Sequence, residues 1–407
     1  MWGLAFLSGG DKIGQVRKTN YFISLLNKFM ESNKKSWWIV GIVVLVILIV
    51  VIVASTKKST ESGPIKIGWI GPLTADGATI GQSAKDAVDL AMSEINTAGG
   101  INGRSVQMIY EDGKCNGKDA VSAATKLINI DKVDVILGGL CSGETLAIAD
   151  QAKKAEVVLF SGCSSNPTIT GTGVIRDVPS DSYQGMYAAD YIFKVLGKKK
   201  VSVIYQQNDQ ATGLRNAFKT EFEKQGGVIV SDEGFVGSTR DFKTQLTKIK
   251  AANPDLIYFL SYAEATIPAL NQAKDMGIKI PFFGGDTWSD PSIIQKAGKN
   301  TEGIMYTGLT SKLNENFVSK MKIKTGGNEV GECSAPSYDA AKILAQAIAK
   351  VGTGDYQTLR KAIIDTVYKD GAYLSEIKFD ANGDLVGAAA VVKKVQDGKV
   401  IEIESLK

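Results

Sequence analysis

The sequence predicts an α/β protein of two doubly wound lobes, each built on a mostly parallel sheet, preceded by a transmembrane helix. Three observations predict this fold class. Short apolar runs alternate with segments of helical periodicity, this alternation restarts once after Tyr183, and an uncharged run of 18 residues, Trp37 to Ala54, precedes both series. Strand–helix–strand alternation gives parallel sheets with right-handed crossovers, so two successive series indicate two similar lobes.

Composition bounds the classes of function. The 407 residues are enough for two domains, and apolar and charged fractions of 44% and 22% are those of a globular protein. Eight basic and two acidic side chains lie in residues 1–58, whereas the whole chain has a formal charge of +4. The residues after 58 are therefore slightly acidic. We therefore expect no nucleic-acid partner.

Catalysis and metal binding are not expected either. The sequence contains no histidine, which excludes Ser-His-Asp and Cys-His catalysis and the commonest zinc ligand sets. The glycine-rich loops lack the spacing of a phosphate-binding loop, and no G-x-G-x-x-G opens a helix after the first strand. The prediction is a protein that is not an enzyme and that carries no metal and no cofactor.

The apolar run at 37–54 is predicted to anchor the chain in a membrane. At about 1.5 Å per residue it is just long enough to span a bilayer, and lysine pairs flank it on both sides. The excess of positive charge before it predicts a cytoplasmic segment at 1–36, a short polar linker at 55–64 and an exported remainder. A buried core helix, a cleaved segment ending near Ala54 and a true start at Met30 remain open alternatives.

In the part predicted to be exported, the sequence predicts strands that alternate with helices. Periodic segments predict helices at 84–95, 120–130, from 146 onward, 186–196, 214–225, 242–251, 265–276, 337–351 and 356–367. Apolar runs predict strands at 65–70, 106–110, 133–137, 157–160, 201–205, 228–230, 256–260 and 281–283, with a final hairpin of 388–395 and 400–403 that turns at Asp397-Gly398.

Two loops rich in small and hydroxyl residues follow neighbouring predicted strands. The first runs from Gly138 to Thr145 and leads into a helix, which we expect a small hydroxyl residue to cap, and the second runs from Ser161 to Pro167. Helix N-termini offer unpaired N–H groups that suit anions, and ligands of open α/β sheets collect beyond the strand ends. The two loops together predict a site for a small carboxylate or amide, although either loop alone could be an ordinary cap and turn.

All four cysteines, Cys115, Cys141, Cys163 and Cys333, lie in the part predicted to be exported, where disulfides persist. Cys115 and Cys141 each follow a strand at the same predicted sheet edge, which makes a bridge between them natural. Cys163 and Cys333 could pair or stay free, because four cysteines allow three connectivities.

Motifs spread over Ile65 to Lys407 resemble a known family. They read IKIGWIGPLTADGATIGQSAKDAVDLAMSEINTAGGINGR, YEDGKCNGKDAVSAATKLI, GGLCSGET, SGCSSNPTIT, DYIFKVLGKKKVSVIY and FDANGDL. In order and spacing these motifs resemble the type I periplasmic binding proteins of the branched-chain amino acid (Leu/Ile/Val) class, the extracytoplasmic receptors of ABC importers.

The resemblance implies two lobes that close on a ligand about a hinge of three crossings. The crossings would fall near 181–183, 310 and 379–380. Lobe 1 would then comprise 65–181 with 311–379, and lobe 2 would comprise 182–310 with 380–407. The resemblance also implies a disulfide between Cys115 and Cys141.

The resemblance further implies which residues bind the ligand. Its carboxylate would be held by Ser142 and by Cys163, Ser164 and Ser165, and its ammonium group by the Leu140 carbonyl and Asp286. A family aromatic residue matches Tyr262. The implied ligand-binding residues on these loops are Leu140, Ser142, Cys163, Ser164, Ser165, Tyr262 and Asp286.

Three departures bear on specificity. Ile80 and Gln210, which we also expect to be ligand-binding residues, stand where amino-acid binders of the family carry aromatic residues, and Cys163 replaces a small residue beside the carboxylate. Trp288 could supply the missing apolar wall or could pack in the core. Asp286 could also be a simple helix cap.

The prediction is an extracytoplasmic, membrane-tethered protein that captures an amino acid or a similar small polar solute and delivers it to the permease subunits of an ABC importer. The alternative is a membrane-tethered receptor ectodomain that senses such a ligand.

Overall fold

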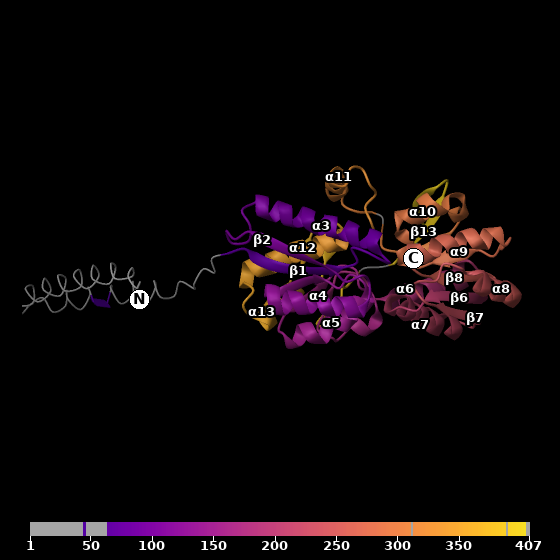
Figure 1. Cartoon of the computed structure of the whole chain (residues 1–407), viewed down its shortest axis with the longest axis horizontal. Helices are drawn as coiled ribbons and strands as arrows, with labels where there is room; N and C mark the ends of the chain where they lie inside the picture. The colour runs from indigo at the N-terminus through magenta and orange to yellow at the C-terminus, as the bar shows by residue number, and fades with distance from the viewer. Residues whose placement is uncertain (1–43, 46–62, 311, 388–389, 404–407) are drawn as a thin grey trace, which may run out of the picture. The chain divides into compact units, whose positions relative to one another are not determined.

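The computed structural model describes residues 44–45, 63–310, 312–387 and 390–403. The predicted cytoplasmic segment 1–36 and membrane anchor 37–54 lie outside these residues, except for Val44 and Leu45. Among the helices in the described ranges, none is both long and apolar enough to cross a membrane. Residues Gly63–Lys407 form one compact unit, which contains two large sheets and the helices that cover them (Figure 1).

The first sheet, with its helices, forms what we call lobe 1. Its five strands are all parallel, in the order β2-β1-β3-β4-β5. Along β1, Ile67 and Trp69 are buried against α3 and α12, whereas Ile70 is buried against α4 and α5 on the opposite face. Because both faces are covered, the strands are almost continuously apolar, and Figure 1 shows the two helix layers on either side of the sheet. The elements are β1 (Ile65–Gly71), α3 (Ala78–Thr97), β2 (Val106–Asp112), α4 (Gly117–Lys126), β3 (Val135–Gly138), α5 (Ser142–Lys154), β4 (Val158–Ser161), β5 (Ile175–Arg176), α12 (Ser334–Val351) and α13 (Tyr356–Ile364).

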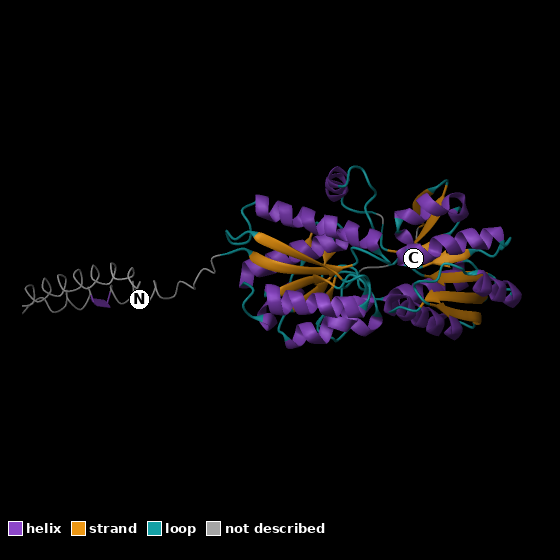
Figure 2. Cartoon of the chain, viewed as in Figure 1, coloured by secondary structure: helices purple, strands orange, loops and turns teal. Residues whose placement is uncertain are grey.

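The second sheet, with its helices, forms lobe 2. Its seven strands have the order β14-β13-β10-β9-β8-β6-β7, and only the last two strands of the chain, β13 and β14, run antiparallel to their neighbours. Neighbouring residues of β8 point to opposite faces, since Tyr258 packs against Phe218 and Phe259 packs against Phe242. Figure 2 shows these strands between helices. The elements are α6 (Asp181–Asp190), β6 (Lys200–Gln206), α7 (Asp209–Lys224), β7 (Val228–Phe235), α8 (Lys243–Ala252), β8 (Leu256–Leu260), α9 (Ala263–Asp275), β9 (Phe282–Gly284), α10 (Pro291–Ala297), β10 (Met305–Gly308), β13 (Val391–Gln396) and β14 (Lys399–Ile403).

The chain passes between the lobes three times. It leaves lobe 1 between β5 and α6, and it returns between β10 and α11 (Glu315–Lys324), a helix that packs on α3. It leaves lobe 1 again between β12 (Glu376–Ile377), which pairs with β11 (Tyr368–Lys369), and β13. The first and third crossings are tied together, because the Arg176 guanidinium lies 2.7 Å from the Asp384 carboxylate and the two residues form a bridge between their backbones.

The predicted helices and strands are present, with differences at their ends. The helices expected at 120–130 and 186–196 each end in a π-helical turn, at Leu127–Asp131 and Tyr191–Val195. Elements such as β5, β10 and α10 were not expected. β5 and α10 have only two and seven residues, which is too short for a period of 2 or 3.6 to be recognised.

Both cysteine pairs are bonded. Cys115 joins Cys141, as the resemblance implied, and Cys163 joins Cys333, the pair that the sequence left open. The Cα atoms are 5.3 Å apart in each pair, a separation typical of disulfides. The second bridge spans 170 residues of sequence and connects the loop after β4 to the start of α12, both within lobe 1.

Candidate functional site

The loop after β3 is the first wall of the site. Gly138 and Gly139 have φ values of 129° and 47°, which favour glycine. A Cβ atom at Gly138 would lie 2.2 Å from the Ile70 carbonyl oxygen, and one at Gly139 would lie 2.3 Å from Thr145 Oγ1. The two glycines therefore let the chain turn sharply from the strand into α5.

The N-cap of α5 is Cys141 and not a hydroxyl residue, so the expected cap was wrong by one residue. Glu144 completes a capping box by accepting the Cys141 N–H at 2.9 Å, and its other oxygen accepts the Cys115 N–H at 3.0 Å. Burial raises the pKa of Glu144 to about 7, although these hydrogen bonds oppose the shift.

Ser142 is the first residue of the helix, and its hydroxyl accepts the Asn166 N–H at 3.2 Å. The hydroxyl of Ser142 thereby links the two loops.

The loop after β4 contains two adjacent serines whose side chains have different surroundings. The Ser164 hydroxyl is turned into lobe 1, where it donates to the Gly139 carbonyl at 2.7 Å and lies 2.6 Å from Thr145 Oγ1. Ser165 lines the pocket. Its hydroxyl is near enough to Asp181 to lower the pKa of that carboxyl, but it makes no hydrogen bond of ordinary geometry with a described residue. Ser165 is therefore available to a ligand, and Ser164 is a structural residue of the loop.

Lobe 2 supplies the opposite wall from the starts of three helices. Tyr262 is the N-cap of α9, Gln210 lies in the first turn of α7, and Asp286 begins the short 3-10 helix Asp286–Ser289. The Gln210 side-chain amide donates to Asp286 Oδ1 at 2.9 Å. Burial raises the pKa of Tyr262, so its hydroxyl stays protonated. Lobe 2 thus presents a carboxylate, an amide and a phenol.

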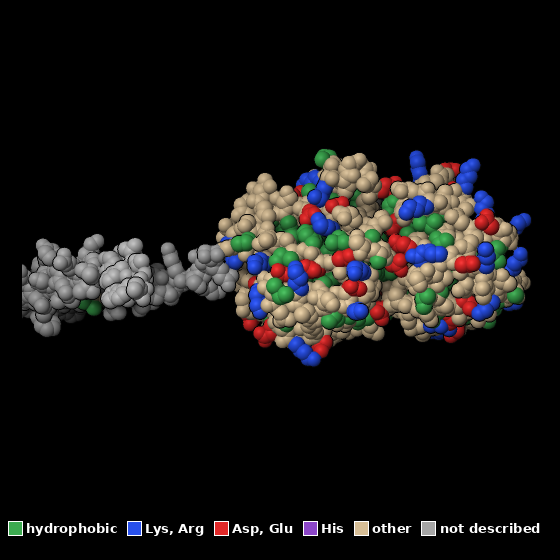
Figure 3. Space-filling view, in the orientation of Figure 1, with side chains coloured by type: hydrophobic (Ala, Val, Ile, Leu, Met, Phe, Trp, Pro, Cys, Tyr) green, Lys and Arg blue, Asp and Glu red, His purple; other side chains and the backbone are tan. Residues whose placement is uncertain are grey.

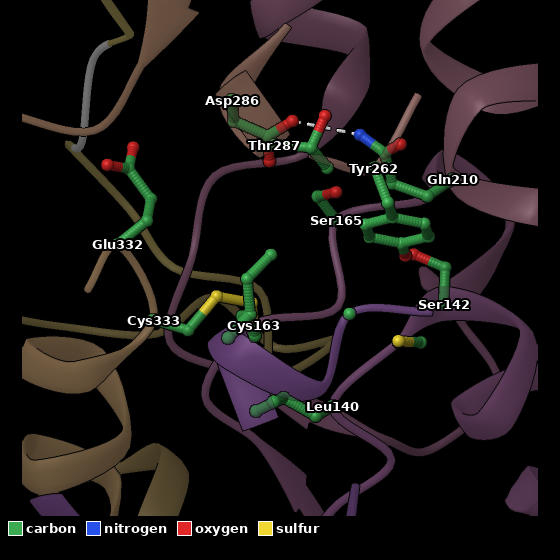
Figure 4. A pocket seen from close by; sticks show the side chains of 13 residues that line it. Leu140, Ser142, Cys163, Ser165, Gln210, Tyr262, Asp286, Thr287, Glu332 and Cys333 are labelled. Atoms are coloured by element: carbon green, nitrogen blue, oxygen red, sulfur yellow. Dashed lines mark hydrogen bonds between the residues drawn. A yellow bond between two sulfur atoms is a disulfide. The ribbon is translucent and has the colours of Figure 1, made fainter. Parts of the chain in front are cut away.

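One pocket brings these residues together. Eight of the nine predicted ligand-binding residues line it, and Ser164 is the exception. The cavity itself has a volume of only about 30 Å³, roughly that of one water molecule, so the two walls must move apart to admit a larger ligand. Figure 4 shows Asp286, Thr287, Gln210 and Tyr262 of lobe 2 in the upper part of the view, with Ser142, Cys163 and Leu140 of lobe 1 below them. The lining residues are Gly77, Ile80, Leu140, Cys141, Ser142, Cys163, Ser165, Gln210, Tyr262, Asp286, Thr287, Glu332 and Cys333.

Two of the polar lining residues, Thr287 and Glu332, were not predicted. The only feature of the sequence that could have pointed to Thr287 is its position directly after Asp286. Glu332 lies 2.8 Å from the Lys393 ammonium group of lobe 2, and the two side chains are 9% and 6% exposed. Its partner is 61 residues away, so no local pattern could identify Glu332.

The pocket is negative at one end. None of the described residues that line it is basic, and Lys393 is already paired with Glu332. Burial, followed by the negative charge of Glu332, raises the pKa of Asp286 to about 6. Burial and then the Asp286 charge hold the pKa of the neighbouring Asp181 well above its usual range. A cation placed beside Asp286 would relieve this cost of an unpaired buried carboxylate.

Trp288 does not form a pocket wall. It is 3% exposed and packs in the core of lobe 2, with its ring centroid 6.0 Å from that of Phe259. The interpretation of Trp288 as a packing residue is therefore the correct one. Within the described ranges no three side chains of the metal-binding types are grouped to hold an ion.

The lobes touch at the mouth of the site. The Gly77 N–H of lobe 1 donates to Glu264 of lobe 2 at 3.5 Å, and the Gln206 amide of lobe 2 donates to Asp76 of lobe 1 at 3.1 Å. On the face that Figure 3 shows, basic and acidic side chains are interspersed, without a basic field of the kind that nucleic acids require. A buried small-molecule pocket between two touching lobes defines the chain as a solute-binding protein.

Comparison with known proteins gives the family. Residues 64–399 match the family described as periplasmic binding protein, and the chain belongs to this family. An amino acid binding protein from Pseudomonas aeruginosa is 28% identical over 344 residues, which cover 82% of this chain and 90% of the relative. Membership of a family of binding proteins agrees with the prediction that the chain is not an enzyme.

Two solved structures are similar along their whole length. A leucine-binding protein from Thermotoga maritima has a TM-score of 0.77 and 29% identity, and the match covers 84% of this chain and 98% of that one. The substrate-binding protein of a branched-chain amino acid transporter from Streptococcus pneumoniae, solved with isoleucine, has a TM-score of 0.75 and 27% identity, with coverage of 84% and 100%. The structure and these relatives agree on an α/β fold of two parallel-sheet lobes.

Proposed function

We propose that the chain captures a free amino acid between its lobes by hinged closure and delivers it to the permease subunits of an ABC importer. The observation that carries this proposal is the placement of Asp286. Its buried carboxylate is hydrogen-bonded by the neutral amides of Gln210 and Gln184, and among the described residues that line the pocket none is basic and able to balance its charge. A ligand with an ammonium group supplies the missing charge.

The opposite wall suits the carboxylate of the same ligand. The Ser142 and Ser165 hydroxyls and the first N–H groups of α5 are groups that bind anions. The Leu140 carbonyl and the Tyr262 hydroxyl complete the set of polar contacts. A zwitterion of this length would contact both lobes at once, and would favour the closed arrangement because closure excludes water from both charges.

The lobe boundaries and the anchor remain part of the proposal. The hinge divides the chain into 65–181 with 311–379 and 182–310 with 380–407. Residues 37–54 form a single membrane span that leaves 1–36 in the cytoplasm and holds the binding unit on the extracytoplasmic side through the linker 55–64. The charge asymmetry and the uncharged run of 18 residues support this topology.

Calorimetric titration of the full chain in mild detergent tests the proposal. The ligands are L-valine, isovalerate, which lacks the ammonium group, and isobutylamine, which lacks the carboxylate. We expect valine to bind at least about 100-fold more tightly than either analogue, since an unpaired buried charge remains in each case. Asp286→Asn should remove most of the valine affinity, whereas Asp150→Asn on the exposed face of α5 should leave it unchanged. Equal binding of isovalerate and valine would contradict an ammonium site at Asp286.

A further inference from the structure

The disulfide between Cys163 and Cys333 is part of the pocket wall. Both residues line the pocket, and Figure 4 shows the bond beside Leu140, on the side of the pocket away from Gln210 and Ser142. Cys163 comes from the loop that carries Ser165, and Cys333 is the N-cap of α12. The bond therefore links the loop that would bind the ligand carboxylate to the longest helix behind it.

The polar contacts of an amino acid determine where its side chain points. With its ammonium group at Asp286 and its carboxylate at Ser142 and Ser165, the ligand has used the polar side chains of two walls. The lining beyond these contacts includes an apolar part, formed by Ile80, Leu140 and the disulfide, with the Glu332 carboxylate next to Cys333 at its edge. An apolar ligand side chain would pack against this part, which includes the two sulfur atoms.

This wall cannot easily recede. A Cβ atom at Gly162, next to Cys163, would lie only 2.7 Å from the Cα and Oγ atoms of Ser337, so the backbone of the loop already rests on α12. Ser337 is 4% exposed. A ligand that is too large must therefore pay the full cost of overpacking.

We propose that the Cys163–Cys333 disulfide is a specificity-determining wall, which limits the size of an apolar ligand side chain and excludes aromatic ones. This inference rests on the proposed capture of an amino acid and names the ligands that the same site accepts. The family disulfide, Cys115–Cys141, contributes only Cys141 to the lining and leaves this side of the pocket to the second bond.

The first test is a calorimetric series of alanine, valine, leucine and phenylalanine on the wild-type full chain in mild detergent. We expect phenylalanine to bind roughly 100-fold more weakly than the tightest of the three aliphatic ligands, the range in which a side chain fails to fit an apolar pocket. If phenylalanine binds as tightly as valine, the proposal that the disulfide limits the size of the ligand side chain is wrong. If none of the four ligands binds, it is the proposed function that fails, and the two failures are thereby distinguished.

The second test changes the wall while it keeps the other disulfide. In Cys163→Ala/Cys333→Ala the sulfur atoms are removed, and we expect the affinity ratio of phenylalanine to valine to rise at least about tenfold. In Cys163→Val/Cys333→Val the volume is refilled without a bond, and we expect the ratio to return to within about threefold of wild type. An unchanged ratio in the alanine variant overturns the proposal. Equal changes in both variants also overturn it, because they would assign the effect to the cross-link and not to the wall. Should the alanine variant fail to fold, the wild-type series still decides.

Discussion

The Gln210 amide holds the Asp286 carboxylate by one hydrogen bond of 2.9 Å, and both side chains come from lobe 2. An amide orients a carboxylate without neutralising it. Asp286 is therefore fixed in position, buried and still short of a positive charge, and its pKa is raised to about 6 by burial and by the charge of Glu332. The pH dependence of binding follows from this pair.

Ligand affinity should fall as the pH is lowered through about 6. Below that value Asp286 carries a proton in the free protein, and an ammonium ligand must displace this proton in order to bind the ionised carboxylate. Linkage then predicts a loss of roughly tenfold in affinity for each pH unit below 6 and little change between pH 7 and 8. Titration of valine from pH 4.5 to 8 measures this dependence.

Neighbouring groups make a control necessary. Burial and the Asp286 charge raise the pKa of Asp181 well above its usual range, so Asp181 is a second candidate for the proton, and Glu332 is paired with Lys393. Glu144, whose pKa is raised to about 7 by burial, also titrates nearby. Asp286→Asn should remove the slope together with most of the affinity. A slope that persists in this variant would assign the proton to another group.

Gln210→Leu should weaken binding and move its midpoint upward in pH. Loss of the 2.9 Å hydrogen bond removes a contact that favours the ionised carboxylate, which is worth about 1.5–3 kcal/mol for a charged acceptor. Affinity at pH 7.5 should fall about tenfold, and the pH midpoint should rise above 6. In the Asp286→Asn background the same change should have a much smaller effect, and equal effects in both backgrounds would show that the pair is not coupled.

The two ligand loops could be located from sequence because their signals are local. The apolar strands β3 and β4 each end at small residues, and strand ends of a parallel sheet meet at one edge. Sequence did not determine which of the consecutive serines faces the ligand. Ser164 turns inward because Gly139 and Thr145 offer it partners, and these contacts depend on how the two loops pack.

Features that depend on long-range packing were not predicted. The position of Glu332 beside the pocket requires α12, β10 and β13 to meet, because Glu332 accepts the Leu309 N–H and pairs with Lys393. The bond from Cys163 to Cys333 depends on the same approach of α12. Asp286, in contrast, came only from the family resemblance, since an aspartate at the start of a short helix is commonly a cap.

The two disulfides should stabilise the fold by different amounts. In the loop-entropy view, the bond that closes 170 residues between Cys163 and Cys333 contributes about 5 kcal/mol, and the bond that closes 26 residues between Cys115 and Cys141 contributes about 3.5 kcal/mol. Urea unfolding of the two double-alanine variants should rank them in this order. The reverse order would show that native-state contacts outweigh the loop entropy.

The ion pair between Arg176 and Asp384 should be the most sensitive point of the hinge. The Arg176 side chain is 0% exposed, lies 2.7 Å from Asp384, and also donates to the Ser165 and Asn166 carbonyls at 3.1 and 2.8 Å. One guanidinium thus ties the first crossing to the third and supports the loop that carries Ser165. Asp384→Ala leaves this cation buried without its carboxylate, and we expect the free energy of unfolding to fall by about 3 kcal/mol.

An exposed pair provides the matched control. Lys154 and Asp150 lie 2.6 Å apart on α5 with side chains 75% and 76% exposed, so Asp150→Ala should cost no more than about 0.5 kcal/mol. Asp384→Ala should also weaken valine binding, because Arg176 no longer fixes the loop of Ser165. Urea unfolding and calorimetry on the same samples measure both effects. If stability falls while affinity is unchanged, Arg176 supports the hinge alone, and the proposed support of the ligand loop is wrong.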